Sequence, residues 1–227
     1  MDIASTIAYL RNKGLTYCGR AGKLETLHRL VAQVEDRSIP GIFVEAGVAM
    51  GGSACIIAKA KRPERELHLF DVFEMLPPPT VRDGQRSMEV YEYFRRGQVR
   101  GLTDVNYVSH ARDLLSFSRE TFKSVGIDPD SANIRFVKGL YQDTLRFDQP
   151  IAFAHIDCDW YDSVTLCISR IADWMSPRGI MLFDDYHSFE GCRRAVDAWL
   201  KADPRFKVIH ADWTVAVERI ADAPLSS

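Results

Sequence analysis

The chain has 227 residues, of which 46% are hydrophobic and 26% are charged, and its formal net charge is -2 at pH 7. This length suits one domain with a substantial core, and the composition excludes both a strongly basic nucleic-acid-binding protein and a disordered polar chain. No apolar run reaches the roughly 18 residues that span a bilayer, the first residues lack a signal-peptide pattern, and the five cysteines include no CxxC pair, so we expect a cytoplasmic protein that binds neither membranes nor nucleic acid.

The first periodic pattern predicts a helix over residues 22–36, within an amino-terminal helical extension over residues 1–40. A buried strand is predicted over residues 42–46, and a glycine-rich turn leads from it into the next helix. Glycines allow a tight turn and a close approach of a ligand, while the start of a helix exposes N–H groups. The turn lacks the dinucleotide-binding glycine spacing, and Glu45 would repel a pyrophosphate but suit a positively charged adenosyl sulfonium. A tight turn without a ligand is the alternative interpretation.

Asp71 and Gly139 follow the next two predicted strands, over residues 67–70 and 134–138. An acidic residue in the position of Asp71 binds a ribose diol in doubly wound folds, although a strand followed by Asp is also a common turn. Gly139 lies at a strand exit where the adenine end of a nucleoside could bind. Residues 74–130, between the two strands, form an insertion with helices predicted over residues 87–96 and 111–125, and we interpret its first part as a lid that faces the substrate.

Two clusters of carboxylates follow the next two apolar runs, residues 151–156 and 179–183, each of which predicts a strand. Asp157 and Asp159 follow the first run, and Asp184 and Asp185 follow the second. Ligands bind at the carboxyl edge of a parallel sheet, and we expect these four side chains to converge there. Crowded carboxylates repel one another unless a hard cation lies between them, which favours a metal site over helix caps and solvated turns.

The remaining pattern completes an α/β chain that we expect to be a single domain over residues 1–227. Residues 164–175 form one apolar helical face, and Pro177 is predicted to end that helix. The last two strands, predicted over residues 206–210 and 214–218, are separated by a short turn and should be antiparallel. We expect a homodimer or a higher homo-oligomer, with the amino-terminal segment and residues 80–101 as candidate contacts.

Five stretches of the chain, taken together, resemble the TylF-type (macrocin-type) O-methyltransferases, which use S-adenosyl-L-methionine and magnesium. They are residues 40–48 with 51–53, residues 71–77, residues 139–145, residues 157–163, and residues 183–186 with 191–193. The resemblance implies a class I methyltransferase fold, that is, a Rossmann-like doubly wound sheet of seven strands with the last strand antiparallel and helices on both faces. Unlike the family, this chain has Ala49 and Met50 in place of a Trp–Arg pair, and His155 in place of an arginine.

The same resemblance implies roles for individual side chains. The magnesium ligands would be Asp157, Asp184 and Asp185. The cofactor would contact Glu45, Gly47, Gly51, Ser53, Asp71, Gly139 and Asp157. Asp159 matches a position proposed as general base in the family, and His187 is a second candidate because the pKa of imidazole is better matched to neutral pH.

The expected reaction is methylation of one hydroxyl of a vicinal diol. The acceptor would be a small hydroxylated molecule, first of all a sugar of a glycosylated natural product, and a catechol is an alternative within the same mechanism. A non-catalytic protein that keeps the fold, as a scaffold or a binder of S-adenosylmethionine, is a further alternative, indicated only by Ala49 and Met50. An NAD-dependent oxidoreductase is disfavoured, because the glycine spacing differs and Glu45 stands where pyrophosphate would bind.

Overall fold

A seven-stranded sheet with the order β3-β2-β1-β4-β5-β7-β6 organises the chain. The computed structural model describes residues 1–16, 22–97 and 113–220, and expectations for other residues lie outside these ranges. Strands β1 to β5 run parallel, and β7 lies antiparallel between β5 and β6, which confirms the predicted fold class. The strands are β1 Ile42–Ala46, β2 Leu67–Asp71, β3 Ile134–Lys138, β4 Ile151–Ile156, β5 Met175–Phe183, β6 Phe206–Ala211 and β7 Val215–Arg219.

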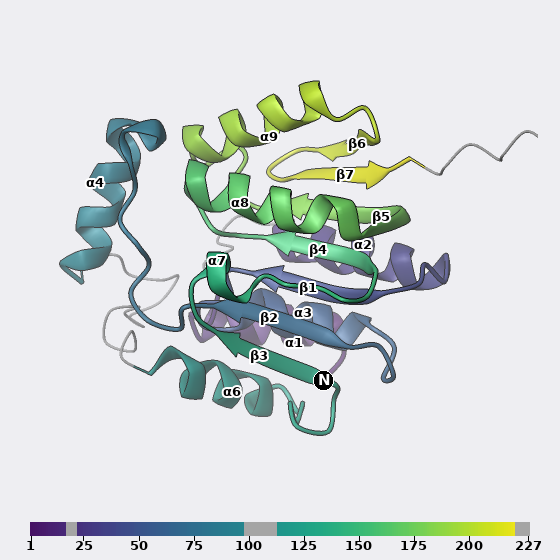
Figure 1. The fold of residues 1–227 in the computed structure, drawn as a ribbon. Coiled ribbons are helices and arrows are strands. Elements are labelled where there is room, and N and C mark those ends of the chain that lie inside the picture. Colours follow the sequence, from purple (N-terminus) through teal and green to yellow (C-terminus); the bar gives the residue numbers. More distant parts are fainter. Residues whose placement is uncertain (17–21, 98–112, 221–227) are drawn as a thin grey trace, which may run out of the picture.

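Helices cover both faces of the sheet (Figure 1). One face carries α1 Ile3–Asn12, α2 Lys23–Asp36, α3 Gly52–Ala60 and α6 Leu114–Ser124. The other face carries α7 Tyr141–Thr144, α8 Tyr161–Ile171 and α9 Glu190–Ala202. Successive strand residues point to opposite faces, so Phe43 and Phe153 pack under the first group of helices while Val44 and Ala154 pack under the second. Within the described ranges, no helix has the length and apolar character of a membrane span.

The insertion between β2 and β3 stands at the edge of the sheet where the parallel strands end. Its described part contains the short helix η1 Val81–Asp83 and helix α4 Gly84–Arg95, which projects away from the body of the sheet (Figure 1). Helix α6 instead packs beside α3, as the predicted crossover requires. The first residues of the predicted 111–125 helix lie outside the described ranges.

The prediction was wrong about the boundary between α8 and β5. The helix ends at Ile171, the short helix η2 Ala172–Trp174 follows, and β5 already begins at Met175, so Pro177 lies inside the strand. Ile151 of β4 pairs with Met175 and Phe153 pairs with Ile180, which leaves extra residues of β5 in a bulge. Proline cannot donate a hydrogen bond to a neighbouring strand and is tolerated at such bulges.

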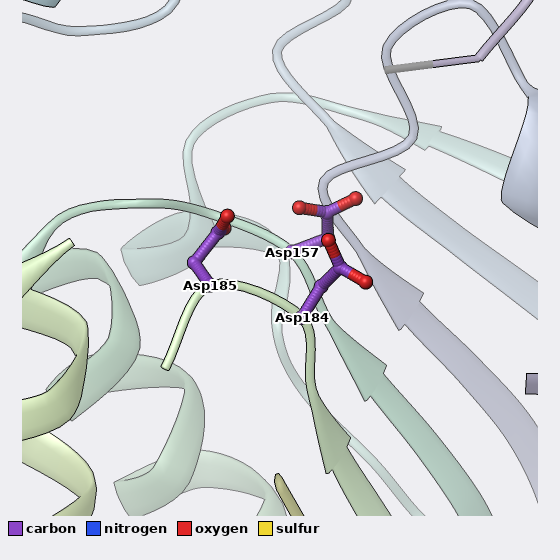
Figure 2. Close-up of side chains that lie close together, drawn as sticks. All are labelled: Asp157, Asp184 and Asp185. Carbon is purple, nitrogen blue, oxygen red and sulfur yellow. The ribbon is translucent and has the colours of Figure 1, made fainter. Parts of the chain in front are cut away.

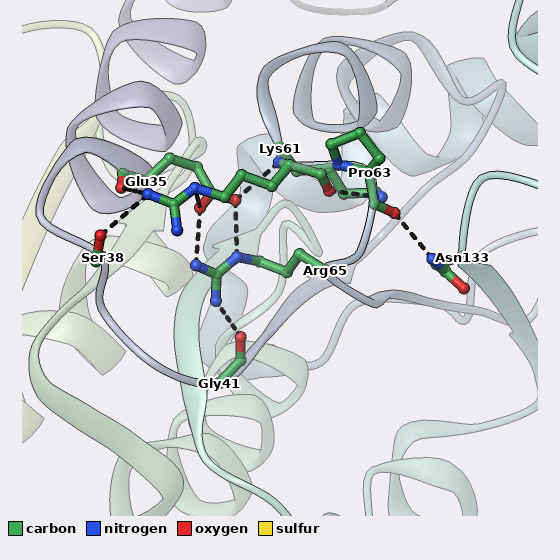
Figure 3. Close-up of polar contacts among 8 residues, drawn as sticks. Glu35, Ser38, Gly41, Lys61, Pro63, Arg65 and Asn133 are labelled. Atoms are coloured by element: carbon green, nitrogen blue, oxygen red, sulfur yellow. Dashed lines mark hydrogen bonds and ion pairs between the residues drawn. The ribbon is translucent and has the colours of Figure 1, made fainter.

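A polar network at the opposite edge fastens the helices to the amino ends of the strands (Figure 3). Glu35 of α2 accepts hydrogen bonds of 2.7 and 2.8 Å from Arg65 and one of 3.0 Å from the backbone of Arg62. Arg65 also donates to the carbonyl of Gly41, immediately before β1. The end of α2, the α3–β2 connection and the start of β1 are therefore tied together, away from the carboxylate clusters.

Candidate active site

Three carboxylates from two neighbouring strands meet at the carboxyl edge of the sheet (Figure 2). Asp157 directly follows β4, and Asp184 and Asp185 directly follow β5. One carboxylate oxygen from each of the three lies within 4.8 Å of the others. Helices α8 and α9 begin after Trp160 and Phe189, so none of these carboxylates caps the helix that follows it. Clustered carboxylate oxygens are the donors that magnesium prefers, and the residues present fit that ion.

The electrostatics of the cluster also favour a cation. Burial raises the pKa of Asp157, and the carboxylates of Asp184 and Asp185 raise it further. Burial and the neighbouring carboxylates likewise raise the pKa values of Asp159 and Asp185. A cation among these side chains would relieve the repulsion that raises their pKa values.

Asp184 differs from its neighbours because two positive groups lie beside it. Burial alone would raise the pKa of Asp184, but His155 and Lys23 outweigh that effect and lower it. The ammonium of Lys23 donates to Asp184 Oδ2 over 2.6 Å, and His155 Nε2 lies 3.9 Å from Asp184 Oδ1. Asp184 is therefore the carboxylate of this cluster that the protein itself holds ionised.

His155 links Asp184 to Glu45, the predicted cofactor residue of β1. His155 Nδ1 lies 2.8 Å from Glu45 Oε1, and the two side chains are 1% and 0% exposed. Burial alone would lower the pKa of His155, but the two carboxylates raise it to about 9. Glu45 thus lies in a buried ion pair beneath the site, and a direct contact between Glu45 and a cofactor stays a prediction.

A cavity of about 660 Å³ opens beside the carboxylates, large enough for a cofactor-sized ligand. Its polar wall contains Lys23, Gly47, Asp71, Asp157, Asp159, Asp184 and Asp185, and its apolar wall contains Leu76, Pro77, Phe94, Trp160, Leu166 and Phe189. Of the predicted cofactor residues, Gly47, Asp71 and Asp157 line this cavity. The other four, namely Glu45, Gly51, Ser53 and Gly139, are outside its lining, although Leu140 beside Gly139 belongs to it.

The glycine turn after β1 is held by Asp71 and touches the acidic loop. Asp71 Oδ2 accepts hydrogen bonds from the backbone of Val48 and Ala49 over 2.8 and 2.9 Å. Gly47 has a φ of +94°, and a Cβ there would lie 1.8 Å from the carbonyl oxygen of Asp157. Only glycine allows this close approach, so the turn and the acidic loop that carries Asp157 form one continuous wall.

The two candidates for general base lie in different environments. Asp159 lines the cavity, and its backbone N–H donates to Asp185 Oδ2 over 3.2 Å. His187 is exposed, packs edge-on against the ring of Tyr186 and lies outside the cavity lining. The geometry therefore favours Asp159 over His187.

Comparison with known proteins assigns the family. Residues 10–217 match the macrocin O-methyltransferase (TylF) family. The chain belongs to this family. It is 29% identical over 180 residues to a Streptomyces olivaceus enzyme named 8-demethyl-8-(2,3-dimethoxy-alpha-L-rhamnosyl)-tetracenomycin-C 4'-O-methyltransferase, with 77% of this chain and 63% of that protein covered. It is 24% identical over 203 residues to demethyldecarbamoylnovobiocin O-methyltransferase of Streptomyces niveus, with 87% and 70% covered.

Solved structures of O-methyltransferases share the fold of this TylF-family chain. The O-methyltransferase NovP superimposes with a TM-score of 0.70 at 23% identity, covering 87% of this chain and 79% of NovP. TomG from Streptomyces achromogenes, solved in complex with SAM, gives a TM-score of 0.60 at 11% identity, covering 98% of this chain and 91% of TomG. At these identities the likeness establishes the class I methyltransferase fold.

Three functional or supporting side chains of this TylF-family chain were not found from the sequence. Lys23 and His155 neutralise the acidic site, and the only sign of His155 was that it replaces an arginine. Asp83 accepts a hydrogen bond of 2.5 Å from the backbone N–H of Tyr161, the first residue of α8. Asp83 thereby holds the start of the insertion against α8, beside the cavity. A Thr-x-x-Asp capping pattern marks Asp83 in the sequence, but nothing local connects it with α8.

Proposed function

We propose that this chain is an S-adenosylmethionine- and magnesium-dependent O-methyltransferase that methylates one hydroxyl of a vicinal diol on the sugar of a glycosylated natural product. The observation that carries the proposal is that Asp157, Asp184 and Asp185 lie on the wall of the same cavity as the glycine turn. The names of the two curated relatives support an acceptor of this class, because both are O-methyltransferases and the first name includes a rhamnosyl group.

The donor half of the site would lie along the glycine turn. S-adenosylmethionine, when bound, supplies an electrophilic methyl group on a cationic sulfur. Gly47 leaves the turn free of a side chain at the cavity wall, and Asp71 fixes the turn through its backbone hydrogen bonds. The excess negative charge of the acidic wall favours the approach of a cationic donor.

The acceptor half would lie over the carboxylates. Magnesium, when held by Asp157, Asp184 and Asp185, supplies charge stabilisation for an ionising hydroxyl and open positions for two neighbouring acceptor oxygens. Asp159 removes the proton from the acceptor hydroxyl, because it lines the cavity next to the ligand cluster. The rings of Trp160 and Phe189 pack edge-on with centroids 5.2 Å apart and give this end of the cavity an apolar lining, which would shield the reacting atoms from water.

A methyl-transfer assay tests the proposal. The purified protein is incubated with S-adenosylmethionine and with acceptors that carry a vicinal diol, including rhamnosides and a catechol. We expect turnover of a sugar acceptor that EDTA abolishes and magnesium restores. Unchanged turnover in EDTA would exclude the metal role. Faster turnover of the catechol than of the sugars would show that the acceptor is a catechol rather than a sugar. The absence of binding heat with millimolar S-adenosylmethionine would favour a scaffold protein instead.

A further inference from the structure

Lys23 places a positive charge inside the acidic wall. It is the first residue of α2, its side chain is 7% exposed, and its ammonium lies at the cavity beside the carboxylates. The ammonium donates to Asp184 Oδ2 over 2.6 Å and to the Asp184 carbonyl oxygen over 2.9 Å. The carboxylate of Asp184 is 8% exposed, so both partners of this ion pair are largely removed from water.

The pairing occupies an oxygen of a proposed metal ligand. Magnesium binds carboxylate oxygens at about 2.1 Å, and an ammonium that remained on the same oxygen would lie only a few ångströms from the ion. Like charges at such a distance repel strongly where water is scarce. If Asp184 Oδ2 binds a divalent cation while the ammonium of Lys23 stays on it, repulsion between the two positive charges weakens both interactions.

We propose that Lys23 is a built-in counter-cation that competes with the divalent cation for Asp184 and so lowers the affinity of the site for the metal. This inference rests on the proposed function, because it assumes that Asp184 binds the metal. In the metal-free protein Lys23, together with His155, compensates the charge of Asp184. The Asp184 carboxylate lies beside those of Asp157 and Asp185 (Figure 2). A divalent cation held by Asp184 would displace the ammonium from Oδ2, and the cavity that Lys23 lines offers space for it.

The charge balance explains why such a competitor does not close the site to metal. Among the described residues, the cavity wall carries six carboxylates against the one ammonium of Lys23, and four of the six, those of Asp157, Asp159, Asp184 and Asp185, lie on the two acidic loops. The remaining negative charge still attracts a divalent cation, whereas removal of the ammonium would strengthen that attraction. The direction of the effect is therefore fixed: loss of the lysine charge tightens metal binding.

Titration calorimetry with magnesium chloride, without cofactor or acceptor, tests the inference. Lys23→Met keeps an unbranched side chain without the charge, and Lys23→Arg keeps the charge as a matched control. We expect Lys23→Met to bind magnesium at least about tenfold more tightly than the natural protein, and Lys23→Arg to stay within about threefold. Lys23→Gln, which is neutral but can still donate to Asp184, should also bind more tightly and serves if Lys23→Met does not fold.

Thermal melting gives a second readout that does not depend on activity. In EDTA the neutral variants should melt at a lower temperature than the natural protein, and saturating magnesium should raise their melting temperature by more. Equal or weaker magnesium binding by the neutral variants would overturn the role of Lys23 and leave the metal site in place. Magnesium binding by none of the proteins would overturn the inference together with the metal part of the proposed function.

Discussion

Replacement of Gly47 by alanine tests whether the glycine turn and the acidic loop form one wall. A Cβ at this position would lie 1.8 Å from the carbonyl oxygen of Asp157 and 2.6 Å from its carbonyl carbon. Backbone atoms cannot turn aside as the end of a flexible side chain can, so the loop that carries Asp157 must shift. A non-glycine residue in the left-handed region costs about 1–2 kcal/mol, and overpacking adds about 1–3 kcal/mol or more.

Gly126→Ala is the matched control for this prediction. Gly126 has a φ of +79°, and no atom of the described residues would lie within 4 Å of a Cβ there. Urea denaturation should show that Gly47→Ala lowers the free energy of unfolding by about 1–3 kcal/mol more than Gly126→Ala does. Calorimetry should also show weaker magnesium binding for Gly47→Ala, because the Asp157 loop has moved. Equal losses of stability in the two variants would refute the close contact between turn and loop.

Asp159→Asn should lower kcat by about 100-fold or more, with little change in the binding of S-adenosylhomocysteine. Asp162→Asn, which neutralises another cavity residue that pairs with an exposed arginine, should leave kcat nearly unchanged. Equal kcat values for the two variants would exclude Asp159 as the base. In EDTA, Asp184→Asn should cost about 3–5 kcal/mol of unfolding free energy, because it removes the buried carboxylate that pairs with the ammonium of Lys23. Asp157→Asn should cost less or stabilise, since it relieves repulsion, and the reverse order would contradict the charge assignment. Burial alone would raise the pKa of Glu35, but hydrogen bonds from Arg65 and Arg62 hold it below its ordinary value of 4.5. The ionised carboxylate of Glu35 therefore stabilises the folded protein above pH 4.5, and this contribution is lost as the pH falls through the folded-state pKa. Glu35→Gln should therefore be less stable than the natural protein by about 1–3 kcal/mol at pH 7, and the difference should shrink as the pH falls below 4.5 through the folded-state pKa of Glu35. A difference that stays constant or grows as the pH falls would contradict this sign.

Strands β1 and β4 are buried along their whole length, and they could be predicted because burial on both faces leaves a continuous apolar signal. Strands β1, β3 and β4 have the bounds that the sequence predicts. The boundary between α8 and β5 could not be predicted, because Trp174 and Met175 continue the helical spacing and Pro177 resembles a helix stop. Pairing of Met175 with β4 overrides that local pattern, and the bulge accommodates the proline.

The convergence of the acidic residues could be predicted because it follows from sheet topology. Two strand ends that lie side by side bring their loops together whatever the rest of the chain does. The side chains that tune the site act across long separations in sequence: 161 residues separate Lys23 from Asp184, and 78 separate Asp83 from Tyr161. Neither pair leaves a local periodic signal, so neither could be found without the packing of α2 and of the insertion.

The register of the strands determines which charged side chains meet at the site. Glu45 lies directly across from His155 in the β1–β4 pair, and His155 lies across from Leu182 in the β4–β5 pair. Because side chains alternate along a strand, Glu45 and His155 share the face that packs under α2, and Asp184 lies two residues beyond Leu182 on that same face. The start of α2 covers this corner, which is why Lys23 reaches Asp184. A slip of one residue between β1 and β4 would turn His155 to the other face and leave Glu45 buried without a cation, so the register that builds the core also fixes which carboxylates stay ionised.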